Sequence, residues 1–547
     1  MARLQSKTSQ DRATDSDLRR GKWMALAAAL LGWMFDGFEI GMFPLVGPNA
    51  LDELLKAELA VNPALKGEWF GVIMSVFLIG AATGGVLFGW LGDRIGRVRA
   101  MSLSIFTYAV FTGLCGFAGE AWQIAVLRFI ASLGMGGEWA LGVALVIEIW
   151  PDRSRAFLAG LIGAASNVGF LFVGLLSLGL VSFIDGVRDL FVTIGVPGRI
   201  MTYLLAGDGW RLLMITGALP ALLIFFIRLF VPESEKWKTE HDKGATSYWA
   251  TRDLVGVLIG AAGAAAVIYL WSPMFDELIR RISPQADGMA SANALTKTIQ
   301  ILGTAVGLGV ALVGYIFPVV RYLKRAELAS QLPVGERRRY VGRMLLGASL
   351  AGVALLGTWG SLQWAPKWAI SLSKLLPEEG GPYHAKEYTQ ISLACGAIIG
   401  TIVAALVAGR IGRRITYVWL CILSFIALVY MYQANHVYNG AMLMSVFAAG
   451  ATTAAFYGWF PLYLPELFPT SIRATSQGFA YNFGRVLSAV GSLQTATLTA
   501  YFAMGVAQDR IEIDAFPKAG AALAGIYLIG VFIIWLGPET KGKPLPE

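Results

Sequence analysis

Residues 148–160 read EIWPDRSRAFLAG, and residues 466–478 read ELFPTSIRATSQG. With one constant offset, five residues coincide in the two stretches: Glu148, Pro151, Arg155, Ala156 and Gly160 fall on Glu466, Pro469, Arg473, Ala474 and Gly478. A second pair, GDRIGRVR at 92–99 and AGRIGRRI at 408–415, has nearly the same offset, with Asp93 replaced by Gly409. Two matching windows at corresponding places indicate an internal duplication, and parallel repeats of this kind place a binding site between the halves.

The composition indicates a membrane protein with many spans. The chain has 547 residues, of which 56% are hydrophobic and only 15% are charged, whereas soluble proteins have about 25% charged residues. The net charge of +8 does not indicate nucleic-acid binding, because the basic residues lie in short loops between apolar runs. The three cysteines lie in apolar segments, so no disulfide framework is expected.

The apolar runs predict fourteen membrane-spanning helices, because about 20 apolar residues cross the hydrocarbon core. Six are expected in the first half, at 23–46, 69–91, 101–119, 121–149, 156–184 and 210–231. Six more are expected at 343–365, 389–409, 415–433, 438–463, 474–503 and 519–537. Two further segments, 254–271 and 298–320, are free of charge and long enough to cross.

The Lys and Arg clusters place the loops relative to the membrane. All clusters fall on one side of the membrane if all fourteen segments cross. If only one of the two middle segments crossed, the basic loops of the second half would lie on the outside. Both middle segments therefore cross or neither does, and we favour both. The predicted organisation is a cytoplasmic tail (1–22), a six-helix bundle (23–235), a linker with two extra helices (236–342), a second six-helix bundle (343–537) and a cytoplasmic tail (538–547). We expect a multi-pass protein of a cell membrane, either bacterial inner or plasma membrane.

Four motifs resemble the major facilitator superfamily over both halves of the chain. They are GWLGDRIGRVRA at 89–100, RFIASLGMGGEW at 128–139, VPESEKW at 231–237 and GPETKGKPLPE at 537–547. The second is similar to a signature of sugar porters and organic-acid/proton symporters, and the last two are similar to the signatures that close each half of sugar-porter-like members. The resemblance implies an all-α fold of two six-helix bundles around a central cavity, and it leaves the two extra helices unexplained.

By this resemblance, charged residues at the cytoplasmic helix ends form ion pairs that close the inward gate. The candidate gating residues are Asp93, Arg94, Arg97, Glu148, Arg155, Glu466 and Arg473. The simpler alternative is that these residues only set the topology and solvate the loops.

Five charged residues lie away from the helix ends: Asp36, Glu39, Arg128, Glu138 and Arg485. Such residues are costly in a membrane and normally face a cavity or a partner. Asp36 and Arg128 lie at similar depths by the rise of roughly 1.5 Å per residue, so we expect them to pair. In sugar-porter-like relatives, protonation of an acid at this place releases the arginine.

Asp36, Glu39, Arg128 and Glu138 are therefore the candidate proton-coupling residues, because no histidine lies in a predicted span. Glu39 is a second proton site or an extra partner of Arg128. A static structural pair is the alternative for Asp36 and Glu39, and a buried polar contact is the alternative for Glu138.

Arg485 suggests an anion site, because a guanidinium binds a carboxylate through two hydrogen bonds. It could instead pair permanently with Glu138 or Asp36. The further candidate substrate-binding residues are Asn167, Tyr457, Tyr481, Asn482 and Gln363. Four tryptophans suit either a cavity wall or the membrane interface: Trp33, Trp359, Trp364 and Trp459.

The sequence thus predicts a proton-coupled symporter of a small carboxylate-bearing metabolite that works by alternating access. DGFE at 36–39 is similar to the motif of aromatic-acid and other metabolite symporters, and 355–369 has a single Gln363 where sugar porters carry paired glutamines. A sugar or polyol symporter is the first alternative, and a non-transporting sensor or scaffold is the second. We expect no enzyme activity, cofactor, metal site or nucleic-acid partner. The expected partners are the substrate, protons and the lipid bilayer, and the expected state is a monomer.

Overall fold

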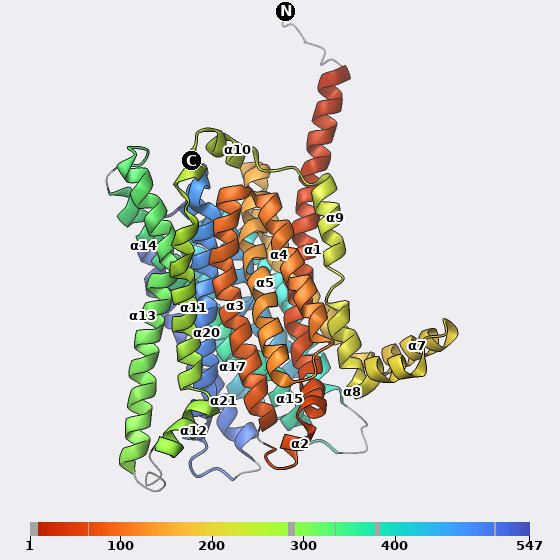
Figure 1. Cartoon of the computed structure of the whole chain (residues 1–547). Helices are drawn as coiled ribbons and strands as arrows, with labels where there is room; N and C mark the ends of the chain where they lie inside the picture. Colours follow the sequence, from red (N-terminus) through yellow and green to blue (C-terminus); the bar gives the residue numbers. More distant parts are fainter. Residues whose placement is uncertain are drawn as a thin grey trace, which may run out of the picture.

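The chain is a bundle of long helices. The computed structural model describes residues 9–63, 65–282, 290–333, 335–377, 383–507 and 510–546, and these contain no strand. Figure 1 shows most of the long helices running side by side, with the start of α1 and the last described residues at the same end of the bundle. The predicted all-α architecture is confirmed.

The helices of the first half are α1 Ser9–Leu54, α2 Lys56–Leu59, α3 Leu65–Ile95, α4 Arg97–Cys115, α5 Ala121–Ile149, α6 Arg155–Leu178, α7 Leu180–Thr193, α8 Gly198–Thr216, α9 Ala221–Phe230 and α10 Glu235–Asp242. Those of the middle and second half are α11 Leu254–Leu270, α12 Pro273–Ile282, α13 Ala290–Leu328, α14 Glu336–Gly360, α15 Ala365–Ser373, α16 Ala385–Ile411, α17 Arg413–Ala434, α18 Gly440–Thr453, α19 Phe456–Tyr463, α20 Arg473–Phe502, α21 Phe516–Leu523 and α22 Ile526–Ile533. Short 3₁₀ or π turns join several of them.

Within the described residues, 12 helical segments are long and apolar enough to cross a membrane, and both extra segments of the middle region are among them. Two of the fourteen predicted spans are not. The segment 210–231 is interrupted by turns at 217–220, between α8 and α9. The segment 474–503 is one continuous helix, α20, but it carries polar residues such as Gln477, Asn482 and Arg485. The structure therefore supports twelve spans, and fourteen stays a prediction.

The internal repeat is visible in the backbone. Gly96 and Gly412 occupy equivalent places in the two matched loops, and their φ angles are 106° and 107°. An L side chain rarely adopts this conformation, so glycine is required at both turns. Arg97 and Arg413, the residues that follow, each begin a helix, α4 and α17.

Glycines also set how closely the helices pack. A Cβ atom at Gly84 of α3 would overlap the backbone of Leu133 in α5. A Cβ at Gly478 of α20 would overlap the carbonyl of Gly85 in α3, which brings one helix from each half into backbone contact. Small residues at helix interfaces permit this kind of approach in membrane bundles.

The two extra helices, α11 and α13, form a pair on one flank of the bundle (Figure 1). They pack on each other and on α3, α14 and α20. The Tyr315 hydroxyl of α13 lies 2.9 Å from Thr83 Oγ1 of α3, and Asp253 at the start of α11 pairs with Arg325 of α13. The extra pair is thus attached to helices of both halves.

Candidate functional site

A cavity lies between the two halves of the chain. It is open to solvent, and the space that the centre of a water-sized molecule can occupy in it is about 40 Å³. Helices α1 and α6 of the first half and α14, α19 and α20 of the second half contribute its walls. The lining residues are Trp33, Asp36, Ile40, Ser166, Asn167, Phe170, Leu355, Trp359, Tyr457, Tyr481 and Arg485.

Five predicted site residues meet in this cavity, namely Asp36, Asn167, Tyr457, Tyr481 and Arg485. Arg485 is 9% exposed, and its Nη1 atom has no hydrogen-bond partner in the described structure. Its guanidinium carbon lies 5.7 Å from the centre of the Tyr481 ring. A buried guanidinium with an unused donor facing a cavity is suited to bind an anionic ligand.

Asp36 has a second buried acid beside it. The carboxyl groups of Asp36 and Glu138 interact with each other, and the Tyr108 hydroxyl lies next to Glu138. The Glu138 carboxyl occupies the space that a side chain at Gly32, one turn before Asp36, would need. Within the described residues, both Glu138 oxygens, Asp36 Oδ1 and the Tyr108 hydroxyl are buried and make no hydrogen bond of normal geometry. Unsatisfied buried polar atoms are costly and commonly mark functional sites.

Glu39 lies in a separate cluster. Its Oε1 atom is 3.3 Å from Arg128 Nη1 and accepts a hydrogen bond of 3.0 Å from Thr112. The Arg128 guanidinium lies 4.5 Å from the ring centre of Phe43 and 4.6 Å from that of Phe77. The expected pair of Asp36 with Arg128 is therefore wrong for this structure, because Glu39 holds the arginine.

The reason for this difference is helical geometry. Glu39 lies three residues after Asp36, which places it about 4.5 Å further along α1 and about 60° around its axis. Counting residues along the helix gives the depth of a side chain but not the direction in which it points, and the ion pair depends on that direction. Asp36 consequently faces the cavity and Glu138, and Glu39 faces Arg128.

Two predicted substrate residues do not line the cavity. The Asn482 amide donates 3.0 Å hydrogen bonds to the carbonyls of Gly136 and Gly478, so it joins α5 to α20. Gln363 lies in the 3₁₀ turn Leu362–Trp364 after α14.

Six lining residues were not among the predicted site residues: Trp33, Ile40, Ser166, Phe170, Leu355 and Trp359. Trp33 and Trp359 belonged to the tryptophans that fitted either a cavity wall or the membrane interface. Trp33 shares a helix face with Asp36, three residues on, and Ser166 adjoins Asn167. These were the available sequence signals.

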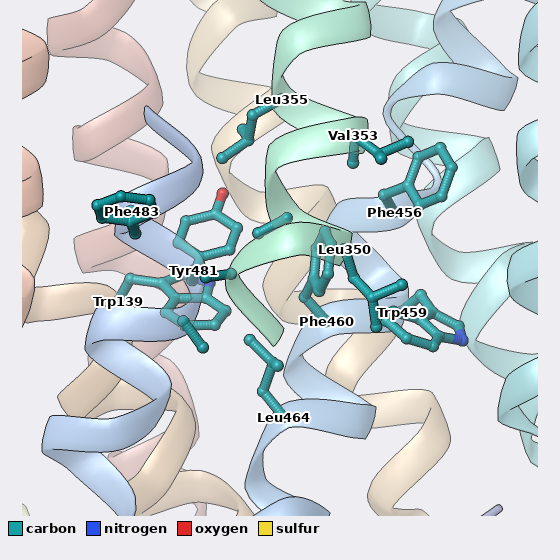
Figure 2. Close-up of a cluster of buried hydrophobic side chains, with 14 of the residues drawn as sticks. Trp139, Leu350, Val353, Leu355, Phe456, Trp459, Phe460, Leu464, Tyr481 and Phe483 are labelled. Carbon is teal, nitrogen blue, oxygen red and sulfur yellow. The ribbon is translucent and has the colours of Figure 1, made fainter. Parts of the chain in front are cut away.

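Buried aromatic side chains pack around Tyr481, which lines the cavity (Figure 2). Trp139 of α5 stacks on Tyr481 of α20, with ring centroids 3.9 Å apart and an interplanar angle of 17°. Phe460 packs edge-on against Tyr481 at 5.8 Å. Because Trp139 precedes Glu148 in α5 and Tyr481 follows Arg473 in α20, this layer separates the cavity from the charged helix ends.

The first charged cluster, called here the Asp93 cluster, contains Asp93, Arg97, Glu148 and Arg473. Arg97 lies 2.8 Å from Asp93 and 3.2 Å from Glu148, and Arg473 of the second half lies 2.7 Å from Glu148. Asp93 accepts hydrogen bonds from the backbone N–H groups of Ala474 and Thr475, at 3.1 and 2.8 Å, and from the Thr475 hydroxyl. The cluster thus joins α3 and α5 to the first turn of α20.

The second charged cluster, called here the Glu466 cluster, contains Glu466, Arg413 and Arg155. Glu466 Oε1 lies 2.7 Å from Arg413 Nη2 and 3.5 Å from Arg155 Nη1 of the first half. Six of the seven predicted gating residues therefore take part in these two clusters. Arg94 does not. It donates a 2.8 Å hydrogen bond to the Thr251 hydroxyl in the middle region.

A glutamate caps the helix that follows each matched loop, and the predictions had not assigned it this role. Glu233 accepts from the backbone N–H groups of Arg97 and Val98, and Glu539 accepts from those of Arg413 and Arg414. Burial alone would raise the pKa of Glu539, but these and neighbouring backbone hydrogen bonds hold that pKa below its usual value. Both glutamates belong to the motifs at 231–237 and 537–547.

Family comparisons agree with the repeated architecture. A family described as "Major Facilitator Superfamily" matches residues 24–373, and one described as "Sugar (and other) transporter" matches residues 382–547. Together these matches cover both halves of the chain, and the first alone covers more than half of it.

Among known proteins, the chain is 25% identical over 526 residues to a putative metabolite transport protein of Haemophilus influenzae, covering 96% of this chain and 98% of that protein. It is 26% identical over 420 residues to the cis,cis-muconate transport protein of Acinetobacter baylyi, covering 77% and 76%. Among solved structures, the proton:xylose symporter XylE bound to 6-bromo-6-deoxy-D-glucose matches with a TM-score of 0.62 and 17% identity, over 96% of this chain and 98% of XylE. The XylE match shows the fold.

Proposed function

Because the chain belongs to the major facilitator superfamily, we propose that its central cavity binds a small carboxylate-bearing metabolite and that alternating access couples its transport to protons. The protein is a multi-pass secondary transporter of metabolites, not an enzyme. We propose in addition that the substrate carries a carboxylate, that its transport is coupled to protons, and that the residues below have the roles given.

The observation that carries the carboxylate assignment is the unused donor of Arg485 in the cavity wall. Arg485 already interacts electrostatically with Asp36. A carboxylate ligand would add a second negative charge and accept from the free donor, whereas a neutral ligand would add no charge. The A. baylyi relative is named for cis,cis-muconate, a dicarboxylate, and supports this class. A sugar or polyol has less support, because Gln363 and Asn482 lie outside the cavity lining.

The proton role is assigned to Asp36 and Glu138. Two buried carboxylates that face each other repel when both are ionised, so the pair favours holding a proton. Asp36 also faces the cavity that contains Arg485, so a bound anion, the arginine and the proton influence one another there. Glu39 is proposed to hold Arg128 in place, because the two side chains form an ion pair at 3.3 Å.

The Asp93 and Glu466 clusters are proposed as the gate at one end of the cavity. They join the halves by charges that separate when that end opens. We place this end on the cytoplasmic side, from the Lys and Arg distribution, and propose fourteen spans and a monomer. The start of α1 and the last described residues lie at the same end of the bundle in Figure 1, which supports an even number of spans.

The binding test is thermal unfolding of the purified protein with a panel of mono- and dicarboxylates and neutral sugars. We expect at least one carboxylate to raise the midpoint temperature of unfolding of the wild type. The same carboxylate should not change the midpoint of Arg485→Ala and should raise that of Arg485→Lys only slightly. Arg188→Ala, an exposed arginine on α7, is the control and should respond as the wild type does. Stabilisation of Arg485→Ala by the same acid, or of the wild type by sugars alone, would refute the carboxylate site.

The transport test is uptake of that acid into proteoliposomes with a pH-sensitive dye inside. Asp36→Asn and Glu138→Gln should abolish the substrate-dependent proton signal while acid binding is retained. Saturable exchange without any proton signal in the wild type would refute coupling. Binding without any uptake would instead favour a sensor or scaffold.

A further inference from the structure

The chain between α6 and the second half of α8 forms a helical hairpin outside the bundle. α7 begins two residues after α6 ends, and Figure 1 shows it extending sideways, across the direction of the long helices. The first half of α8 returns toward the bundle, and α8 breaks where Gly207, Asp208 and Gly209 have positive φ angles of 54°, 56° and 68°. The transport site does not use this hairpin.

The sequence of α7 is amphipathic. Phe183, Leu190 and Ile194, the residue after the last turn of α7, lie on one side of the helix and are 39%, 54% and 63% exposed. The smaller Val181 and Val192 are exposed on the other side. Asp185 and Arg188 lie on the other side, where they form a 2.8 Å ion pair. A helix with three large exposed apolar side chains in one line requires an apolar environment on that side.

The height of α7 along the bundle identifies that environment. The preceding span, Asp152–Leu178, has 27 residues, or about 40 Å of helix against a hydrocarbon thickness of about 30 Å. α7 therefore starts at the level of the lipid headgroups, at the end of the bundle opposite the Asp93 cluster. Phe172 and Leu175 in the last turns of α6 are 45% and 49% exposed, so the lipid-facing surface of α6 leads directly into α7.

The base of the hairpin is fixed to the bundle. Ile184 of α7 is buried against Gly209. The Arg211 guanidinium lies 4.3 Å from the centre of the Tyr203 ring, donates to the Tyr203 hydroxyl at 3.1 Å and pairs with Glu53 of α1 at 2.7 Å. These contacts set the direction in which the apolar side of α7 faces.

We propose that α7 and the first half of α8 form an interfacial hairpin that inserts Phe183, Leu190 and Ile194 into the bilayer surface. Helices with a large apolar face and a polar face lie in the plane of the membrane interface in this way. The polar face of α7 carries a paired Asp185 and Arg188 rather than an excess of cations. Insertion therefore depends on apolar burial and does not require anionic lipids.

The test places a fluorescent bimane on either side of α7 in vesicles of phosphatidylcholine. Cys115 and Cys421 are buried, so only Cys395 is replaced, by alanine, before Leu190→Cys or its opposite-face control Asp185→Cys is introduced. A lipid with a doxyl group near its headgroup should quench the label at 190 about threefold more than the label at 185, and aqueous iodide should show the reverse order.

Equal quenching of both labels by iodide would overturn the proposal, because α7 would then lie in water. The proposal would also be overturned if the label at 190 were protected from both quenchers and lost this protection when the protein is diluted with lipid. A second copy of the chain would then cover the apolar side of α7. Ile194→Cys on the same apolar line replaces Leu190→Cys if that variant does not fold.

Discussion

The Asp93 cluster and the Glu466 cluster are built from the same repeated parts, but they hold the two halves together differently. In the first, the Asp93 carboxylate binds the backbone N–H groups at the start of α20, in the opposite half. In the second, Gly409 takes its place and has no side chain, so only Arg155 reaches across, at 3.5 Å from Glu466. A carboxylate at a helix N-terminus is favourable, and the duplication therefore kept the fold while concentrating the bonds between halves at the α3–α20 interface.

The largest expected effect comes from removing the central acid of each cluster. Glu148→Gln takes the acid partner from the fully buried Arg473 and leaves Arg97 with Asp93 alone, and the loss of one partner of a buried ion pair costs about 3–5 kcal/mol. Glu466→Gln also takes the acid partner from Arg413. It should cost somewhat less, because Arg413 and Arg155 are 7% and 4% exposed, whereas Arg97 and Arg473 are fully buried. Thermal unfolding in nanodiscs should show the lower midpoint for Glu148→Gln. Equal losses would contradict the asymmetry between the two clusters.

A smaller effect is expected when the first cluster is made to resemble the second. Asp93→Gly removes three hydrogen bonds to Ala474 and Thr475, each worth about 1 kcal/mol, and should let this end of the bundle open more often. The measurement is maleimide labelling of Ser476→Cys, because Ser476 is fully buried and a thiol there reacts only after opening.

The matched control for this change is Arg94→Ala in the same loop. Arg94 bonds to Thr251 rather than to the second half, so its loss should leave the labelling rate nearly unchanged. If Asp93→Gly and Arg94→Ala accelerate labelling alike, the bonds of Asp93 to α20 do not hold the end closed.

The reverse exchange, Gly409→Asp, should add a bond between halves to the second cluster. By the repeat, its carboxylate would face the first turn of α6, which begins at Arg155, with a gain of about 1 kcal/mol. A Cβ at position 409 would meet the Ala156 Cβ at 2.9 Å, so Ala156→Gly is combined with it. We expect slower labelling of Ser476→Cys than in Ala156→Gly alone. Unchanged labelling would mean that the repeat does not place donors there.

The smallest effect concerns the capping acid Glu539. Its pKa is lowered in the folded protein, so its contribution is present above the usual value of roughly 4.3 and is lost as the pH falls through the lowered folded pKa. Glu539→Gln should reduce stability at neutral pH by about 1 kcal/mol, as for other caps, and flatten the loss of stability below about pH 4.5. Thermal unfolding followed by circular dichroism from pH 3 to 7 measures this pH dependence. If Glu539→Gln lost stability below about pH 4.5 as steeply as the wild type does, the prediction would be wrong.

The predicted gating residues of the two clusters lie together in the structure because their positions follow from the repeat. Glu148, Arg155, Glu466 and Arg473 lie at fixed offsets from helix ends, and helix ends are set by local signals such as the Pro151 and Pro469 turns. The capping role of Glu539 was missed, because its partners Arg413 and Arg414 are more than 120 residues away along the chain.

The sequence indicated which charged residues lie within the membrane spans, but not which acid pairs with which arginine. The sequence identified Asp36, Glu39, Arg128 and Glu138 because a charge in an apolar run is conspicuous and costly. It did not determine that Glu39 rather than Asp36 binds Arg128, since that choice depends on one turn of α1 relative to α5.

The sequence alone thus determined the helical class, the duplication and which buried charges need an explanation, because apolar length, repeated motifs and the cost of charge are local properties. Only the tertiary structure decided which acid meets which arginine, which residues face the cavity and how α7 projects from the bundle. These depend on the rotation and height of one helix against another, which close glycine contacts such as Gly84 with Leu133 fix in space.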